Sequence, residues 1–290
     1  MSGPVHFEAP SALDFFAALV ADDRSLPLLE AAIAVAQDDM PGLDVQGVLA
    51  EVDTLAERLC RRLPADAPPL QRLRQLNPYF FQELGFAGNV NDYYDPANSL
   101  LPRVLATRRG IPITLALLYI EMAQRAGLQA HGVCFPGHFL VKLNLPNAGR
   151  VVEVVIDPYS GQSLTREDLE ERLLPFRRQL QRQGAPAAEL ALGTWLQPAT
   201  SREILTRLLR NLKEVHRSAS DLPRLAAVLR RLVIVQPLLG AERRELAVVL
   251  ARLGRHAEAA DELAAYLQHR PDAADVLRLR EELAQWRGAH

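Results

Sequence analysis

Residues 112–126 constrain the fold most, because this segment is apolar on nearly every side of a helix. Its apolar side chains are Leu115, Ala116, Leu117, Leu118, Ile120, Met122 and Ala123. A helix without a polar face is typical of the buried centre of a protein. Pro112 suits the first helical turn, where its missing N–H leaves no bond unmade, and Gly127 favours the end of the helix. The sequence therefore predicts a central, buried helix.

Two segments with a period of two residues follow this helix, at 138–143 and 151–157. Alternation of this kind predicts β-strands, and the turn-forming residues 145–150 between them predict an antiparallel hairpin. If Asn144 faces Val151, the apolar residues of both strands share one face. The other face then pairs Lys142 with Glu153 and His138 with Asp157. A turn of another length would shift this register.

Helical periodicity dominates the first hundred residues, in segments that begin at Ser11, Leu26, Asp44 and Pro69. Residues 89–99 interrupt it with a run of turn-forming and polar residues that predicts an ordered loop. Loops of this composition often line binding sites. Candidate binding residues here are Tyr94, Asp95, Asn98 and Ser99.

The last third of the chain has the spacing of a helical repeat. Pro237 and Pro271 lie 34 residues apart, the length of a tetratricopeptide repeat. The unit that ends at Pro271 places Ala247, Gly254, Ala259 and Leu263 where such a repeat packs small or apolar residues. A plain helical bundle with a chance period is the alternative. We predict an α+β, mostly helical fold, with residues 1–200 forming the core and 201–290 the repeats.

Composition excludes several classes of protein. A net charge of −2 over 290 residues argues against binding nucleic acid through its phosphates. The arginines between 166 and 182 predict a solvated helix face. Cys60 and Cys134 cannot form a disulfide framework, and no Cys or His spacing indicates a zinc site. With no signal-peptide pattern and no apolar run of roughly 20 residues, we expect a cytoplasmic protein without metal or cofactor.

Several motifs together resemble the SirB-one family. They are Tyr93-Tyr94-Asp95-Pro96-Ala97-Asn98-Ser99, Arg109-Gly110-Ile111-Pro112-Ile113, Phe135-Pro136-Gly137-His138-Phe139 and Ile156-Asp157-Pro158. The resemblance implies a bacterial protein with a helical N-terminal part, a transglutaminase-like (papain-type) core and C-terminal tetratricopeptide-like repeats.

The same resemblance implies that the catalytic cysteine is missing. The wider class carries Gly-x-Cys-x-x-x-Ala before a helix that ends in Gly; Gly110, Ala116 and Gly127 keep that spacing, and Pro112 takes the cysteine position. His138 and Asp157 match the class histidine and aspartate. Proline cannot act as a nucleophile.

Two side chains could substitute for the missing nucleophile. Cys134 is expected to be packed, on the strand face opposite the His138 ring, and Thr114 to be a capping or packed residue. His138 and Asp157 also fit a satisfied structural pair that does not react.

Two functions follow from this reading of the sequence. The first is a pseudoenzyme that binds a protein or peptide partner through its repeats and a vestigial cleft lined by Tyr94, Asp95, Asn98, Ser99, His138 and Asp157. The alternative is a residual hydrolase or protease, in which His138 and Asp157 activate Cys134 or a water molecule.

Overall fold

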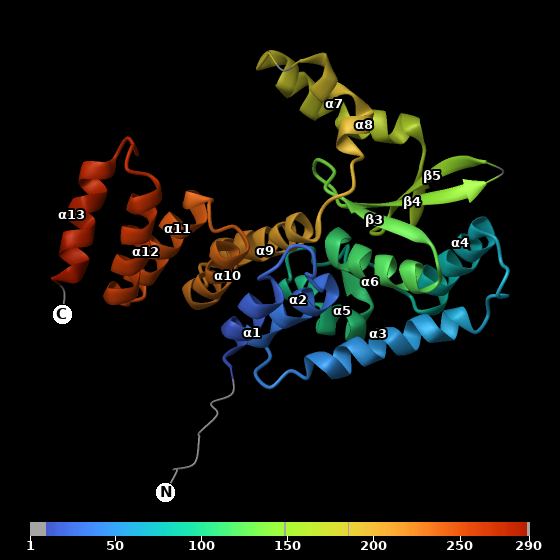
Figure 1. Cartoon of the computed structure of the whole chain (residues 1–290), viewed down its shortest axis with the longest axis horizontal. Coiled ribbons are helices and arrows are strands. Elements are labelled where there is room, and N and C mark those ends of the chain that lie inside the picture. The colour runs from blue at the N-terminus through green and yellow to red at the C-terminus, as the bar shows by residue number, and fades with distance from the viewer. Residues whose placement is uncertain (1–9, 148, 185, 289–290) are drawn as a thin grey trace, which may run out of the picture. The chain divides into compact units, whose positions relative to one another are not determined.

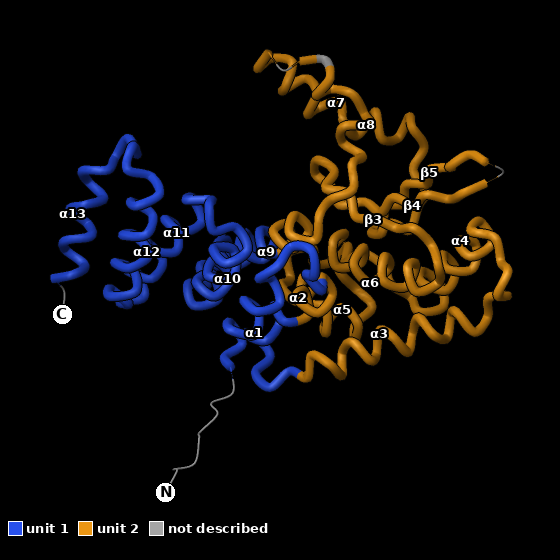
Figure 2. The backbone as a smooth tube through the Cα atoms, in the orientation of Figure 1, with its two compact units in different colours: residues 1–27, 34–43, 209–290 blue, residues 28–33, 44–208 orange. Residues whose placement is uncertain are grey.

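The computed structural model describes residues 10–147, 149–184 and 186–288 (Figure 1). Its chain clusters into two compact units, drawn in two colours in Figure 2. Unit 2 comprises residues 28–33 and 44–208, and unit 1 comprises residues 1–27, 34–43 and 209–290. N-terminal segments thus belong to the same unit as the C-terminal repeats. The boundary at residue 200 stays a prediction.

Helices make up most of unit 2. They are α2 (Leu28–Ala34), α3 (Val45–Cys60), α4 (Pro69–Pro78) with the π-helix η2 (Tyr79–Glu83), η3 (Pro96–Ser99), α5 (Leu101–Thr107), α6 (Pro112–Arg125), α7 (Arg166–Arg182), η4 (Ala187–Leu190), α8 (Leu192–Trp195) and the start of α9 (Ser201–Ser218). Asp44 begins α3 by accepting a hydrogen bond from the Gly47 N–H at 2.9 Å. Polar caps and proline starts therefore fix several helix ends from local sequence alone.

Helix α6 is the buried centre of unit 2, as predicted. Pro112 occupies its first turn, and all but a few of its side chains are buried. It contacts α3, α4 and α5 on one side and strands β3 (Gln129–Val133) and β4 (Leu140–Asn147) on the other. Gly127 follows the helix with a φ of 76°, a conformation that favours glycine.

The larger sheet has four antiparallel strands in the order β3-β4-β5-β6, where β5 is Arg150–Asp157 and β6 is Gln162–Leu164; a second sheet pairs β1 (Ala87–Gly88) with β2 (Arg109–Gly110) in parallel. The sequence indicated only β4 and β5, and their predicted register is wrong by two residues: Asn144 pairs with Glu153, not Val151. The strands extend to the pair Asn147 and Arg150, so the hairpin closes more tightly than expected. Ala148, inside the predicted turn, lies outside the described residues.

A shift of two residues leaves every side chain on its predicted face. Val141 pairs with Ile156 and Leu143 with Val154, so the apolar face is confirmed. Lys142 and Glu153 become diagonal neighbours, and their charged groups still lie 2.7 Å apart. The pairing of His138 with Asp157 is lost, because β4 begins only at Leu140.

Helices α7 and α8 cover the other face of the sheet. A cluster of buried apolar residues joins them to the strands: Val133, Phe135, Leu140, Val155, Leu169, Leu173, Leu192 and Leu196. The sheet of unit 2 therefore has α6 on one face and α7 and α8 on the other. Helix α7 starts at the Thr165 cap, whose hydroxyl accepts the Asp168 N–H at 3.2 Å.

Unit 1 contains α1 (Ala12–Leu19), η1 (Val35–Asp38), the end of α9, α10 (Leu222–Val235), α11 (Gly240–Arg252), α12 (His256–His269) and α13 (Val276–Arg287). Consecutive helices from α10 to α13 pack against one another, and α10 also contacts α1 and η1. Arg231 on α10 is buried over the Phe16 ring and is ion-paired with Asp38. N-terminal side chains thereby complete the core of this unit.

The repeat positions behave as the 34-residue spacing predicts. Ala247, Ala259 and Leu263 are buried, and Gly254 turns the chain between α11 and α12 with a φ of 75°. Lys213, at a position where small residues are usual, directs its ammonium group to Glu245 on α11 at 3.3 Å. An ion pair therefore takes the place of close small-residue packing in the first repeat.

The predicted α+β, mostly helical fold class is confirmed, with a transglutaminase-like core and a helical repeat tail. No helix in the described ranges has the length and apolar content needed to cross a membrane.

Candidate functional site

The start of α6 is the position to which the resemblance assigns the nucleophile of the class. Pro112 is its first residue. Thr114 in the same turn is fully buried, and its hydroxyl lies within hydrogen-bond distance of the carbonyl oxygens of Asn98 at 2.8 Å and Ile111 at 3.0 Å, to either of which it can donate its one proton. These bonds join the 89–99 loop to the helix. Thr114 is thus a capping residue, as expected.

Asp157 is held by a partner that the sequence did not indicate. Its Oδ2 atom accepts a hydrogen bond from Arg172 Nη1 at 3.0 Å, and its Oδ1 atom accepts the Tyr159 N–H at 3.0 Å. The Asp157 side chain is only 7% exposed. Within the described residues it makes no hydrogen bond to His138, so the expected contact between the two is a wrong prediction. The carboxylate instead joins β5 to α7.

His138 lies in the turn that precedes β4 and is half-buried. Its backbone N–H donates to the Phe135 carbonyl at 3.0 Å, which closes the Pro136-Gly137 turn. Burial and the neighbouring Arg172 and Arg207 charges lower the pKa of its imidazole, while Asp157 opposes them. The ring is therefore mostly neutral near pH 7, and in the described parts of the chain it makes no hydrogen bond to Asp157.

Cys134 is exposed, which corrects the expectation that it is packed. Enough protein surrounds its thiol that partial desolvation raises the pKa, and Glu203 adds to this effect, whereas Arg207 opposes it. A thiol with a raised pKa is mostly protonated at neutral pH, and the protonated form is a poor nucleophile. Exposure alone therefore does not make Cys134 an activated nucleophile.

The 89–99 loop is ordered by its own polar side chains. Asn98 is buried; its amide donates to the Asp92 carbonyl at 2.6 Å, and its Oδ1 atom accepts from Asn89 Nδ2 at 3.0 Å. Asp95 caps η3 by accepting the Ala97 N–H at 2.8 Å, and Ser99 is buried. These groups shape the loop. Their role as ligand contacts stays a prediction.

Three tyrosine rings form the outer surface beside this loop. Tyr93 and Tyr94 are in edge-to-face contact at 5.4 Å, and the Tyr159 ring lies 6.0 Å from that of Tyr93. Tyr94 is 75% exposed. The Tyr159 ring lies where a side chain on Gly88 would project, so Gly88 is required for this close approach. The Tyr159 hydroxyl donates to the Asn89 carbonyl at 2.9 Å and joins the loop to the end of β5.

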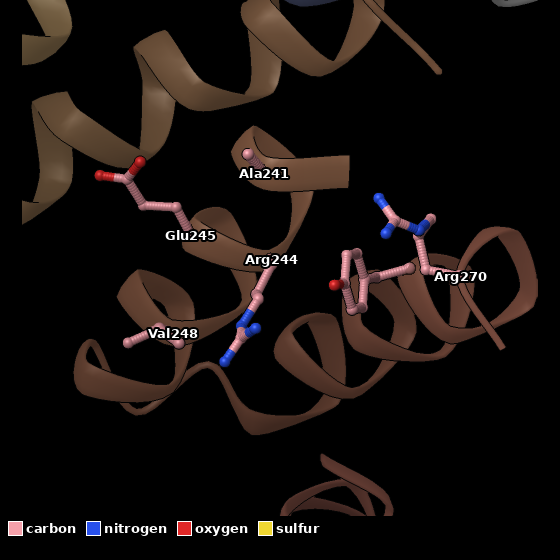
Figure 3. A pocket seen from close by; sticks show the side chains of 6 residues that line it. Ala241, Arg244, Glu245, Val248 and Arg270 are labelled. Atoms are coloured by element: carbon pink, nitrogen blue, oxygen red, sulfur yellow. The ribbon is translucent and has the colours of Figure 1, made fainter. Parts of the chain in front are cut away.

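Unit 1 contains a pocket among the repeat helices, with a volume of about 410 Å³. Figure 3 shows the side chains that line it, which come from α11, the end of α12 and the residue after it: Ala241, Arg244, Glu245, Val248, Tyr266 and Arg270. The Tyr266 ring lies where a side chain on Gly240 would project, so Gly240 allows this ring to approach the start of α11 closely. Apolar surface and two guanidinium groups therefore meet in one cavity.

The charges in this pocket are unequally neutralised. The Glu245 carboxylate forms ion pairs with Arg217 at 2.5 Å and with Lys213 at 3.3 Å. The Arg244 guanidinium forms an ion pair with Asp275 at 2.5 Å. Among the described residues, the Arg270 side chain has a single ion pair, a long contact of 3.5 Å to the exposed Asp272. The pocket thus leaves Arg270 as the cation that is most available to a ligand. The sequence suggested the repeats but gave no signal for this cavity, because its lining comes together only when α11 and α12 pack.

Comparison with known proteins identifies both parts of the chain. The family described as transglutaminase-like superfamily matches residues 46–210, and the tetratricopeptide repeat family matches residues 212–284. The resemblance drawn from the sequence motifs is thereby confirmed. No solved structure matches the chain.

Similar proteins occur in bacteria and in animals. A UPF0162 protein of Xylella fastidiosa is 35% identical over 267 residues, which cover 90% of each chain. A UPF0162 protein of Pseudomonas aeruginosa is 34% identical over 67% of this chain and 66% of its own length. Human F-box only protein 21 is 28% identical over 49% of this chain and 27% of its own. The chain therefore belongs to the transglutaminase-like superfamily, as a relative of the bacterial UPF0162 proteins with C-terminal tetratricopeptide repeats.

Proposed function

We propose that this protein is a non-catalytic, transglutaminase-like protein that binds a protein or peptide partner through its repeat unit. The observation that carries the proposal is the pocket lined by Tyr266, Val248 and Arg270. Stacked helical repeats provide concave surfaces for extended peptides. A mixed apolar and cationic lining favours a segment that presents an apolar side chain next to a carboxylate.

Three features support the absence of catalysis. Proline stands at the class cysteine position, the Thr114 hydroxyl is committed to backbone carbonyls, and the Asp157 carboxylate is bound by Arg172. Activation of a nucleophile requires a base within hydrogen-bond reach, held in turn by a third group. The described residues near α6 offer no such chain of contacts.

The alternative, a residual hydrolase, rests on Cys134 and His138. Cys134 is exposed and His138 is neutral near pH 7, as a general base must be. The raised pKa of the Cys134 thiol and the engagement of Asp157 oppose this function. We keep it as a second candidate, to be decided by thiol labelling.

Affinity capture with the full chain tests the binding proposal. Cells of the source organism would be lysed, and proteins retained by the immobilised chain identified by mass spectrometry. Val248→Glu and Arg270→Glu each place a negative charge in the pocket and should abolish capture of a specific partner. Val248 is exposed, so its replacement leaves the core intact.

Leu277→Glu is the matched control, because Leu277 is 73% exposed in the same unit and does not line the pocket. This variant should capture the partner as the wild type does. Retention of every specific partner by both pocket variants would contradict the proposed site. Loss of capture by His138→Ala alone would move the binding site to unit 2.

A further inference from the structure

Arg207 on α9 is a cation in unit 2 to which the proposed function assigns no role. Ile204, one turn earlier on the same helix, and the Phe139 ring both lie where a side chain on Gly132 would project, which places this face of α9 beside β3. The charge of Arg207 lowers the pKa of three side chains: Cys134, which follows β3; His138, which precedes β4; and Tyr93 in the 89–99 loop. The position of Ile204 beside Gly132, together with these electrostatic effects, places Arg207 near these three segments.

This guanidinium has no ion pair or hydrogen bond to any residue in the described parts of the chain, and Arg207 is half-buried. The acidic groups nearest to it are already committed. Asp157 is bound by Arg172 at 3.0 Å. Glu203, four residues before Arg207, accepts the Thr200 N–H at 2.7 Å and the Thr200 hydroxyl at 2.9 Å. None of the Arg207 nitrogen atoms is among the buried side-chain atoms that lack a partner, so the guanidinium reaches solvent and is available to an anion from solution.

Neighbouring groups complete a site that suits an organic anion. His138 is half-buried beside this cation, and the Tyr93 and Tyr159 rings lie 6.0 Å apart at its edge. Aromatic surface favours the organic part of a ligand, and a guanidinium binds an oxyanion through two parallel N–H groups. The surroundings are open to solvent, because Cys134 and Tyr93 are both exposed.

We propose that Arg207, with His138 and Tyr93 beside it, binds the carboxylate of a small organic acid or of a peptide C-terminus. Charge distinguishes a carboxylate from a phosphate here. Arg172 is already neutralised by Asp157, so the site offers one free positive charge, which a single carboxylate balances. A phosphate dianion would leave a negative charge uncompensated beside Asp157. This site lies in unit 2 and is independent of the repeat pocket.

Nuclear magnetic resonance of the His138 ring in the full chain tests both the location and the ligand class. His138→Gln identifies the resonance among the seven histidines. Without ligand, Arg207→Gln should raise the pKa of His138, because Arg207 lowers it. Arg178→Gln, on the exposed side of α7, is the control and should leave that pKa unchanged. An unchanged pKa in Arg207→Gln would overturn the location.

Four probes then decide the ligand: acetate, the N-acetylated tripeptide of alanine with a free carboxyl terminus, the same tripeptide amidated, and inorganic phosphate. Acetate or the free-acid tripeptide should shift the His138 resonance with saturation below about 0.1 M, and the amidated peptide should not. Tighter binding of the free-acid tripeptide than of acetate assigns the site to a chain terminus. Equal binding assigns it to a small acid.

The affinity of the better probe should fall about tenfold or more in Arg207→Gln and be partly restored in Arg207→Lys, which keeps the charge. This pair of variants separates loss of the cation from loss of folding. Equal binding of the amidated peptide, tighter binding of phosphate than of either carboxylate, or no saturable shift with any probe would overturn the proposal. Because these probes do not involve the repeat pocket, failure here leaves the capture experiment to decide the proposed function separately.

Discussion

Arg172 on α7 holds the carboxylate of Asp157 at the end of β5, with Nη1 and Oδ2 3.0 Å apart. The Asp157 side chain is almost fully buried, so this ion pair satisfies an anion that water cannot reach. Within the described residues, this carboxylate makes hydrogen bonds to Arg172 and to the Tyr159 N–H and none to His138. One contact between a helix and a strand thus sets the position of the aspartate that the resemblance matched to the class.

Replacement of Arg172 should therefore destabilise unit 2. Arg172→Gln leaves the buried Asp157 carboxylate without its cation, and we expect a loss of about 2 kcal/mol in the free energy of unfolding, measured in urea. Arg178→Gln, on the same helix but exposed, should change stability little. Equal stability of the two variants would mean that the ion pair contributes nothing to the fold.

Thiol labelling should be slow at Cys134 near neutral pH, because desolvation raises the pKa of this thiol. Iodoacetamide labelling of Cys60→Ser, followed by mass spectrometry, isolates the Cys134 rate. Arg207→Gln should slow labelling further, because it removes a cation that favours the thiolate. Fast labelling that is abolished by His138→Ala would instead support the hydrolase alternative.

Acid should destabilise unit 1 through His216. This side chain is 3% exposed, and burial lowers the pKa of its imidazole. The Arg224 charge also lowers this pKa, whereas the Asp39 and Asp221 charges raise it. The folded protein binds this proton less readily than the unfolded chain, in which the histidine pKa is about 6.5. Stability is therefore complete above about pH 6.5 and falls as the pH decreases below it.

His216→Leu should reduce this acid sensitivity, since the ring Nε2 atom has no hydrogen-bond partner in the described structure. Urea unfolding at several pH values between about 5 and 8 measures the effect. The wild type and the variant should differ in slope below pH 6.5 and not above it. Identical slopes would show that His216 does not titrate on unfolding.

The two residues of the Arg231 and Asp38 ion pair should respond unequally to replacement. Arg231 is 1% exposed, whereas Asp38 lies at the edge of the same contact. Asp38→Asn leaves a buried guanidinium uncompensated and should cost about 3 kcal/mol. Arg231→Met leaves a carboxylate that water can reach, and should cost less. Thermal and urea unfolding would measure both; the opposite order would contradict the burial argument.

Deletion of residues 209–290 should not leave an intact N-terminal region. Phe16 is fully buried under Arg231, and α10 contacts α1 and η1 within unit 1. The truncated chain would expose these apolar side chains, and we expect it to aggregate or to lose its cooperative urea transition. A cooperative transition at the wild-type midpoint would show instead that residues 10–43 do not depend on the repeats.

Local sequence determined most helices and the faces of the two central strands. The apolar segment 112–126 could only be a buried helix, and Ser11 and Asp44 cap the helices that follow them. Alternation placed Val141 and Ile156 on the same apolar face of the hairpin. These features depend on neighbours within a few residues, and periodicity reports them directly. The short strands β3 and β6 lacked enough alternation to be recognised.

Tertiary structure decided the partners of the charged residues. Arg172 lies in a segment whose arginines predicted a solvated face, yet it reaches a carboxylate 15 residues away on the sheet. A two-residue shift in the hairpin changed every cross-strand pair without changing any face, which periodicity cannot detect, and β4 begins only after His138. The position of Arg207 and the lining of the repeat pocket depend likewise on helices packing against distant elements. Contacts between residues far apart in sequence leave no local pattern, so only the folded chain reveals them.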